Sequence, residues 1–125
     1  MPRDMRRIDP LKKQAREQSR ENLARAVAVR ERLSTLRRAL RHEQVDYYEL
    51  ILGNVPEWHE TAQRIKLASL ITNVKGIGKG TVYTILANHG ANPEDRLEDL
   101  TYKEREELAA IVRTVRQMHG YDRQT

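Results

Sequence analysis

The sequence lacks cysteine and phenylalanine, and it contains one tryptophan and only six glycines. Without cysteine the chain has no disulfide scaffold, no thiolate nucleophile and no cysteine-ligated zinc or iron–sulfur site. No run approaches the roughly 18 consecutive apolar residues that a membrane-spanning helix requires. Because no apolar stretch follows the basic N-terminus, we expect no secretory signal. The 125 residues are expected to form one small domain with at most an appendage, in a reducing compartment.

Acidic residues are scarce in the first third of the chain. Residues 1–42 carry 13 of the 23 Lys and Arg residues but only five of the 18 acids, whereas residues 43–125 carry ten basic residues and 13 acids. This asymmetry favours a polyanionic partner, with nucleic acid the first candidate and an anionic membrane surface the second. A solvated helix with many surface arginines is the simpler alternative, but so long a basic run favours a partner.

Helical signals extend over most of the chain, and no segment alternates between apolar and polar residues as a strand would. Residues 10–41 contain no glycine and are rich in Ala, Arg, Leu, Gln and Glu, which predicts one long helix. Further helices are predicted over residues 44–52, 58–72 and 81–89, and from a capping box at Thr101 and Glu104 to about Gly120. The predicted fold is all-α.

Apolar residues are unevenly spread along the first predicted helix. From Val29 to Leu40 they recur at helical spacing and predict a buried stripe, whereas residues 1–22 offer too few apolar groups to pack. We therefore expect residues 1–22 to form a mobile basic arm, residues 23–120 a helical domain and residues 121–125 a tail.

A glycine-rich turn, residues 75–81, lies between two predicted helices and is called the glycine hairpin below. A P-loop would need glycine in place of Asn73 and Ser or Thr directly after Lys79, and a dinucleotide fingerprint would need glycine in place of Thr81 after a strand. A helix–hairpin–helix turn fits better, because its glycines permit sharp turning and the next helix presents free N–H groups to a phosphate. A helix–helix turn without a ligand is the alternative.

Basic residues surround the glycine hairpin, and catalytic patterns are missing. Residues 64–79 include four Lys or Arg and no acid, which is typical of a surface that holds a nucleic-acid backbone without reading bases. The four histidines are scattered, and none of the three serines lies in a nucleophile elbow. We therefore expect no enzymatic activity.

Two adjacent segments resemble a known family. The stretch from Arg64 to Ile71, followed by Val74 to Lys79, resembles the region of actinobacterial-type integration host factor in which a basic helix leads into a Val/Ile-Gly-Lys hairpin. The long Ala/Arg-rich helix and the closing segment with Leu97, Leu100 and a final helix are similar too. The resemblance covers roughly residues 20–116.

The resemblance implies a helical domain with a helix–two-turns–helix core. It implies a non-catalytic, nucleoid-associated protein of the bacterial cytoplasm that binds double-stranded DNA with little sequence specificity, and a diverged or phage-encoded member of the family fits the sequence. Such a protein bends or compacts DNA and assists site-specific recombination beside a recombinase or another nucleoid protein. No cofactor, metal, membrane or small-molecule substrate is expected.

The expected DNA contacts combine the residues above with this resemblance. They are Arg64, Lys66, Lys75, Gly76, Ile77, Gly78, Lys79, Gly80, Thr81 and Arg96, with Arg25, Arg30, Arg37, Arg38 and Arg41 from the long helix. Where the family carries several arginines after a proline, this chain has Asp95, Arg96 and Glu98. Only Arg96 therefore carries over there as a phosphate contact.

Two other interpretations remain open. The Gly76–Gly78 turn and the segment from Gly90 to Thr101 also resemble an RNA-binding small-subunit ribosomal protein with the same helix–two-turns–helix unit. That protein ends in a basic tail, whereas the basic segment here is N-terminal, which favours the DNA-binding family. A helical protein–protein adaptor is the third interpretation.

Overall fold

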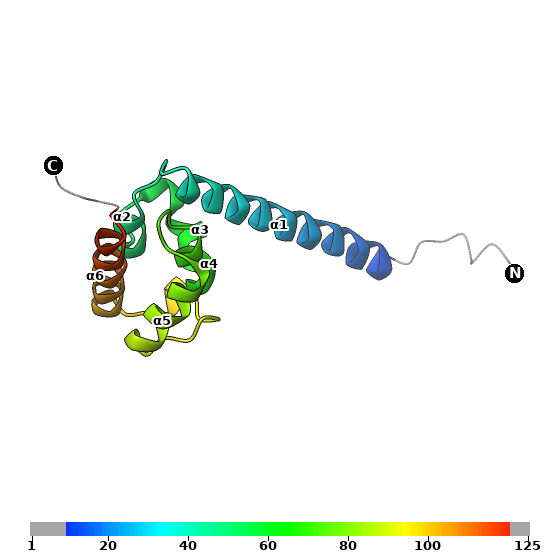
Figure 1. Ribbon diagram of the computed structural model, residues 1–125. Coiled ribbons are helices and arrows are strands. Elements are labelled where there is room, and N and C mark those ends of the chain that lie inside the picture. The colour runs from blue at the N-terminus through cyan, green and yellow to red at the C-terminus, as the bar shows by residue number, and fades with distance from the viewer. Residues whose placement is uncertain (1–9, 121–125) are drawn as a thin grey trace, which may run out of the picture. The chain divides into compact units, whose positions relative to one another are not determined.

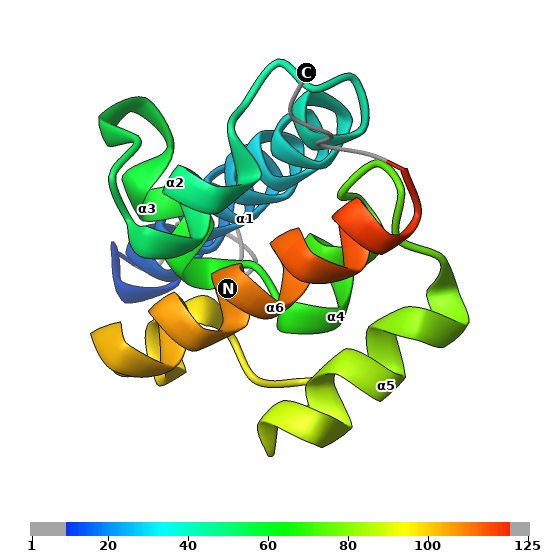
Figure 2. The same cartoon turned by 60° about the vertical axis from the view of Figure 1, so that its left-hand side comes forward.

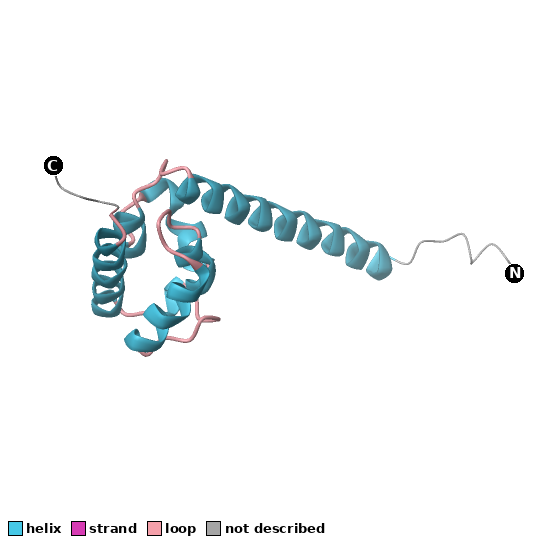
Figure 3. Ribbon diagram, viewed as in Figure 1, coloured by secondary structure: helices cyan, strands magenta, loops and turns pink. Residues whose placement is uncertain are grey.

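The computed structural model describes residues 10–120, in which helices are joined by loops and turns without any strand (Figure 3). The all-α prediction is therefore confirmed for these residues. The chain divides into two compact units after Glu31, so residues 10–31 and residues 32–120 are described separately; the latter are called the domain. The predicted tail and residues 1–9 of the predicted arm lie outside the described range.

Helix α1 (Pro10–Arg41) has the predicted bounds and begins in the first unit (Figure 1). Within that unit, residues 11–28 are all exposed and Val29 is half-buried. Within the domain, Leu36 and Leu40 are buried, as the apolar stripe predicted. The mobility predicted for residues 1–22 stays a prediction, although residues 10–22 are helical.

Helix α2 (Tyr47–Leu52) is shorter than the predicted helix over residues 44–52. The predicted start at Gln44 was wrong. The Asp46 carboxylate accepts hydrogen bonds from the N–H groups of Tyr48 and Glu49, so Asp46 is the N-cap and the helix begins at Tyr47. The end was right: Gly53 adopts the left-handed conformation with a φ of 85°, which terminates the helix.

The helix predicted over residues 58–72 is interrupted in the structure. A 3₁₀ turn η2 (Pro56–Trp58) leads into α3 (His59–Arg64), and α4 (Leu67–Thr72) begins only after an extended break at Ile65 and Lys66. The break is caused by tertiary hydrogen bonds: the Leu67 N–H donates to the Asp95 carbonyl at 2.8 Å. The Leu97 N–H donates to the Ile65 carbonyl at 3.2 Å. Apolar spacing alone could not reveal this pairing.

The C-terminal half follows the predictions more closely. Helix α5 (Lys79–His89) starts two residues earlier than expected, and Gly90 ends it with a φ of 76°. A 3₁₀ turn η3 (Leu97–Asp99) precedes α6 (Tyr102–Met118). The capping box is present, with the Glu104 N–H donating to Thr101 Oγ at 3.2 Å and the Thr101 N–H donating to Glu104 Oε1 at 2.8 Å. The bond from the Thr101 backbone N–H first, and a hydrogen bond of the Thr101 side chain second, hold the pKa of the Glu104 carboxyl below its ordinary value.

One apolar core holds the domain together. Helix α6 packs against α2 and α5, and α4 packs against α5 (Figure 2). The core includes Leu36, Leu50, Ile51, Trp58, Ile65, Leu67, Leu70, Ile71, Val74, Val82, Leu86, Leu97, Leu108 and Val112. The one charged side chain buried in the described chain, Arg116, pairs with Glu43 at 3.0 Å and lies over the Tyr47 ring.

We predict that removing residues 1–22 leaves the thermal midpoint within about 2–4 °C of the full chain, because surface groups contribute little to stability. Leu36→Ala, by contrast, should cost about 2–5 kcal/mol, because it opens a cavity in the core. Thermal and urea unfolding followed by circular dichroism measure both. A truncation as costly as Leu36→Ala would show that the arm is part of the folded core.

Candidate nucleic-acid interface

The glycine hairpin is fixed to the domain by Ile77, by the preceding Val74 and by His119, the C-cap residue of α6. Val74 and Ile77 are buried, and the Ile77 N–H donates to the Val74 carbonyl at 3.2 Å. Between them Gly76 has a φ of 99°, a conformation that other residues rarely adopt. Nδ1 of His119 lies 2.9 Å from the Gly76 carbonyl oxygen. In the tautomer that carries a proton on Nδ1, this nitrogen donates a hydrogen bond to that oxygen. The turn is therefore held from both sides.

Helix α5 begins at the hairpin without a capping side chain. Gly78 is the N-cap residue and supplies no side-chain acceptor to the first turn. A Cβ at Gly78 or Gly80 would meet no atom within 4 Å, so both glycines border open space. A helix N-terminus carries partial positive charge and unsatisfied N–H donors, both of which attract anions. The backbone here offers an approachable site for a phosphate.

The two lysines predicted beside the start of α5 add positive charge to the exposed surface there. Lys75 and Lys79 are exposed, and neither forms an ion pair with any residue between 10 and 120. The hairpin residue Ile77 is buried and so supports the turn rather than its surface, and Thr81 is half-buried. Tyr83, on the following turn of α5, is 59% exposed.

The second group of predicted contacts lies at the extended break between α3 and α4. Lys66 and Arg96 are opposite residues of an isolated antiparallel bridge, a geometry that places two Cβ atoms about 4.5–5.5 Å apart on one face. Both side chains are exposed, and Arg96 has no ion pair within the described residues. Arg64 is exposed in the last turn of α3.

The acidic residues near Arg96 differ from one another in their contacts. Asp95 accepts from the Asn92 N–H at 3.3 Å, and Asp99 accepts from the Arg96 N–H at 2.8 Å, so both cap local turns. Glu94 forms an ion pair with Lys66 at 2.7 Å, a contact that the sequence did not predict. Glu98 has no ion pair within residues 10–120.

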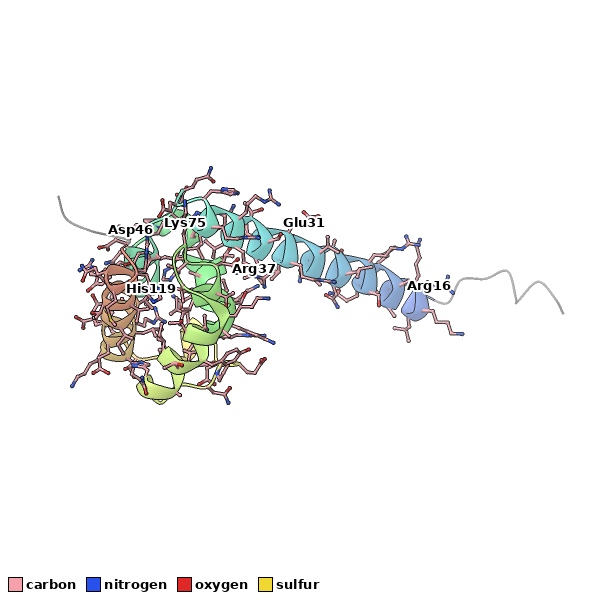
Figure 4. All side chains as sticks on the ribbon, viewed as in Figure 1. Arg16, Glu31, Arg37, Asp46, Lys75 and His119 are labelled. Carbon is pink, nitrogen blue, oxygen red and sulfur yellow. The ribbon has the colours of Figure 1, made fainter. Side chains whose placement is uncertain are left out.

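The predicted arginines of α1 fall into both units. Arg25 and Arg30 are exposed in the first unit. Arg38 and Arg41 are exposed within the domain. Arg37 is half-buried, and its Nε donates to Ser69 Oγ on α4 at 2.7 Å, so it ties α1 to α4 (Figure 4).

Sequence reasoning missed Glu94 and His119, since neither lies in a recognisable motif. Their roles follow from contacts across the fold, with Lys66 and with Gly76 respectively. Between residues 10 and 120 no group of three His, Cys, Asp or Glu side chains could hold a metal ion. No helix in that range is long and apolar enough to cross a membrane.

The sequence matches no protein-family model and no curated protein. Among solved structures the chain is similar to sIHF, an integration host factor, in a structure described as sIHF bound to an 8-base-pair palindromic DNA. The superposition has a TM-score of 0.60 at 20% identity, and it covers 70% of this chain and 96% of sIHF. The fold expected from the resemblance to integration host factor is thereby confirmed: this chain has the fold of sIHF.

Proposed function

We propose that this protein is a non-catalytic duplex-DNA-binding protein that contacts the phosphate backbone with little regard to base sequence. The observation that carries the proposal is the uncapped start of α5 between Lys75 and Lys79. Backbone N–H groups and the exposed lysines Lys75 and Lys79, which have no ion pair within residues 10–120, form a surface that suits phosphate. Neither group distinguishes one base pair from another, so affinity comes without sequence readout.

We propose that a single duplex contacts both groups of cations. The Lys66–Arg96 pair lies at the start of α4 and the glycine hairpin follows its end, and a six-residue helix is only about 9 Å long. Duplex DNA carries a charge about every 1.7 Å along its axis, so several phosphates fall within that span. The proposed surface consists of Arg64, Lys66, Lys75, Gly76, Gly78, Lys79, Gly80, Thr81 and Arg96, with Ile77 as its buried support and with Arg38 and Arg41 as further charges.

The wider biological role rests on the likeness to sIHF, whose structure is described with DNA bound. We extend the proposal to bending or compaction of DNA in a bacterial nucleoid, assisting site-specific recombination. Arg25 and Arg30 of the first unit, together with Arg37, complete the proposed set of contacts, although Arg37 must release Ser69 to reach a phosphate. A comparison of equal-length duplex DNA, duplex RNA and single strands by gel shift tests the proposal. Equal or stronger RNA binding would contradict it.

Binding is predicted to tolerate changes of DNA sequence but not of salt. Log K should fall linearly with log salt, with a slope near −0.9 per phosphate neutralised. Lys75→Ala and Lys79→Ala should each weaken binding to all sequences alike and reduce the steepness of that slope by about one phosphate equivalent. Fluorescence anisotropy on two unrelated duplexes measures both quantities.

Lys103→Ala is the matched control for these two variants. Lys103 is an exposed lysine at the start of α6, roughly 20 Å along the helix from the end that contacts Gly76. It should leave affinity almost unchanged. If the hairpin variants instead altered which sequence is preferred, the backbone-contact proposal would fail.

The face around Arg96 provides a separate prediction. Arg96→Ala should weaken DNA binding several-fold, because an exposed guanidinium without an ion pair in the described part of the chain is lost. Glu98→Arg should strengthen binding and steepen its salt dependence, because a charge within about a Debye length (8–10 Å) of phosphates changes sign. Anisotropy titrations at three salt concentrations measure both effects. If neither variant changed the affinity for DNA, the DNA contact would be limited to the hairpin and α1.

A further inference from the structure

Glu94 neutralises one cation of the proposed DNA surface. Its Oε2 lies 2.7 Å from Nζ of Lys66, while the neighbouring Arg96 has no acidic partner within the described residues. The ammonium group of Lys66 therefore faces a carboxylate in the position where a phosphate would bind.

The backbone holds Glu94 beside Lys66. The Ala68 N–H donates to the Pro93 carbonyl at 3.2 Å and the Leu67 N–H to the Asp95 carbonyl at 2.8 Å, so the residues on both sides of Glu94 are bonded to the start of α4. The Glu94 N–H itself donates to Asn92 Oδ1 at 2.9 Å. The carboxylate can leave Lys66 by rotating its side chain, but the loop cannot carry it away without breaking these bonds.

Stability does not account for this ion pair. The Lys66 side chain is 53% exposed and that of Glu94 72% exposed, and such solvated pairs contribute little to folding. Exposure also means that water and solution anions reach Nζ from the open side. The pair is thus accessible to an incoming phosphate and cheap to break.

We infer that Glu94 is an internal competitor of the DNA phosphate for Lys66, and this inference rests on the proposed function. In the free protein Lys66 pairs with Glu94. On binding, a phosphate displaces the carboxylate, which turns away but remains close enough to repel the DNA. Glu94 therefore lowers affinity and makes binding readily reversible, and it determines how much Lys66 contributes.

The test is a double-mutant cycle between Glu94→Gln and Lys66→Ala, read as duplex-DNA affinity at several salt concentrations. Glu94→Gln should raise affinity about two- to fivefold at low salt and steepen the salt slope by about one phosphate equivalent. Lys66→Ala should cost less than about twofold in the native background but about two- to fivefold beside Glu94→Gln, because only there is the ammonium fully available.

Glu98→Gln is the matched control, since Glu98 is a carboxylate nearby in the chain without an ion pair in the described structure. It removes the same charge, but its effect should simply add to that of Lys66→Ala. Thermal midpoints of all variants should stay close to that of the native chain, so that affinities compare folded proteins.

The possible results distinguish a failure of this inference from a failure of the proposed function. Coupling between Glu94 and Lys66 with additivity at Glu98 supports competition. Additivity at both positions would overturn it, since Glu94 would then act only as a distant repelling charge. Unchanged affinity for Glu94→Gln would also overturn it. Absence of duplex-DNA binding by both the native chain and Glu94→Gln at low salt would instead overturn the proposed function itself.

Discussion

The backbone pairing between residues 65–68 and 93–97 is the constraint on which the proposed interface depends. Its hydrogen bonds end α3 at Arg64, begin α4 at Leu67 and keep the two residues between them extended. The same pairing makes Lys66 and Arg96 neighbours across the bridge. It also brings Glu94 to Lys66, so one set of bonds positions both cations and the carboxylate that pairs with Lys66.

The glycine hairpin complements this arrangement at the other end of α4. Buried Val74 and Ile77 anchor it, while Gly76 supplies the left-handed turn between them. The hairpin thus leaves α5 with an open N-terminus and no capping side chain. Charges and N–H groups fixed on a rigid helix start meet a phosphate without prior rearrangement, which lowers the cost of binding. On the proposed function, affinity for DNA therefore depends on the shape of the backbone as much as on charge.

Local signals made most of the helices and the hairpin predictable. Glycines at 53 and 90, the capping box at Thr101 and the length of α1 were visible in the sequence. The break at Ile65 was not, because apolar spacing continues through it and hydrogen bonds from a distant segment decide the conformation. Lys75 and Lys79 could be assigned to the hairpin because they are its neighbours in the sequence. The Lys66–Glu94 ion pair and the hydrogen bond from Arg37 to Ser69 join residues far apart in the sequence, so only the folded structure reveals them. Non-local contacts therefore limit prediction of the site more than that of the helices.

The central claim is that the start of α5 holds the phosphate backbone, and amide chemical shifts measure this most directly. The ¹⁵N-labelled protein would be titrated with two duplexes of equal length and unrelated sequence. The account predicts that the amides of Lys79, Gly80 and Thr81 shift most and follow nearly the same course with both duplexes, because backbone N–H groups contact phosphate and not bases. Shifts confined to the acidic start of α6, or hairpin shifts that appear with only one duplex, would contradict it.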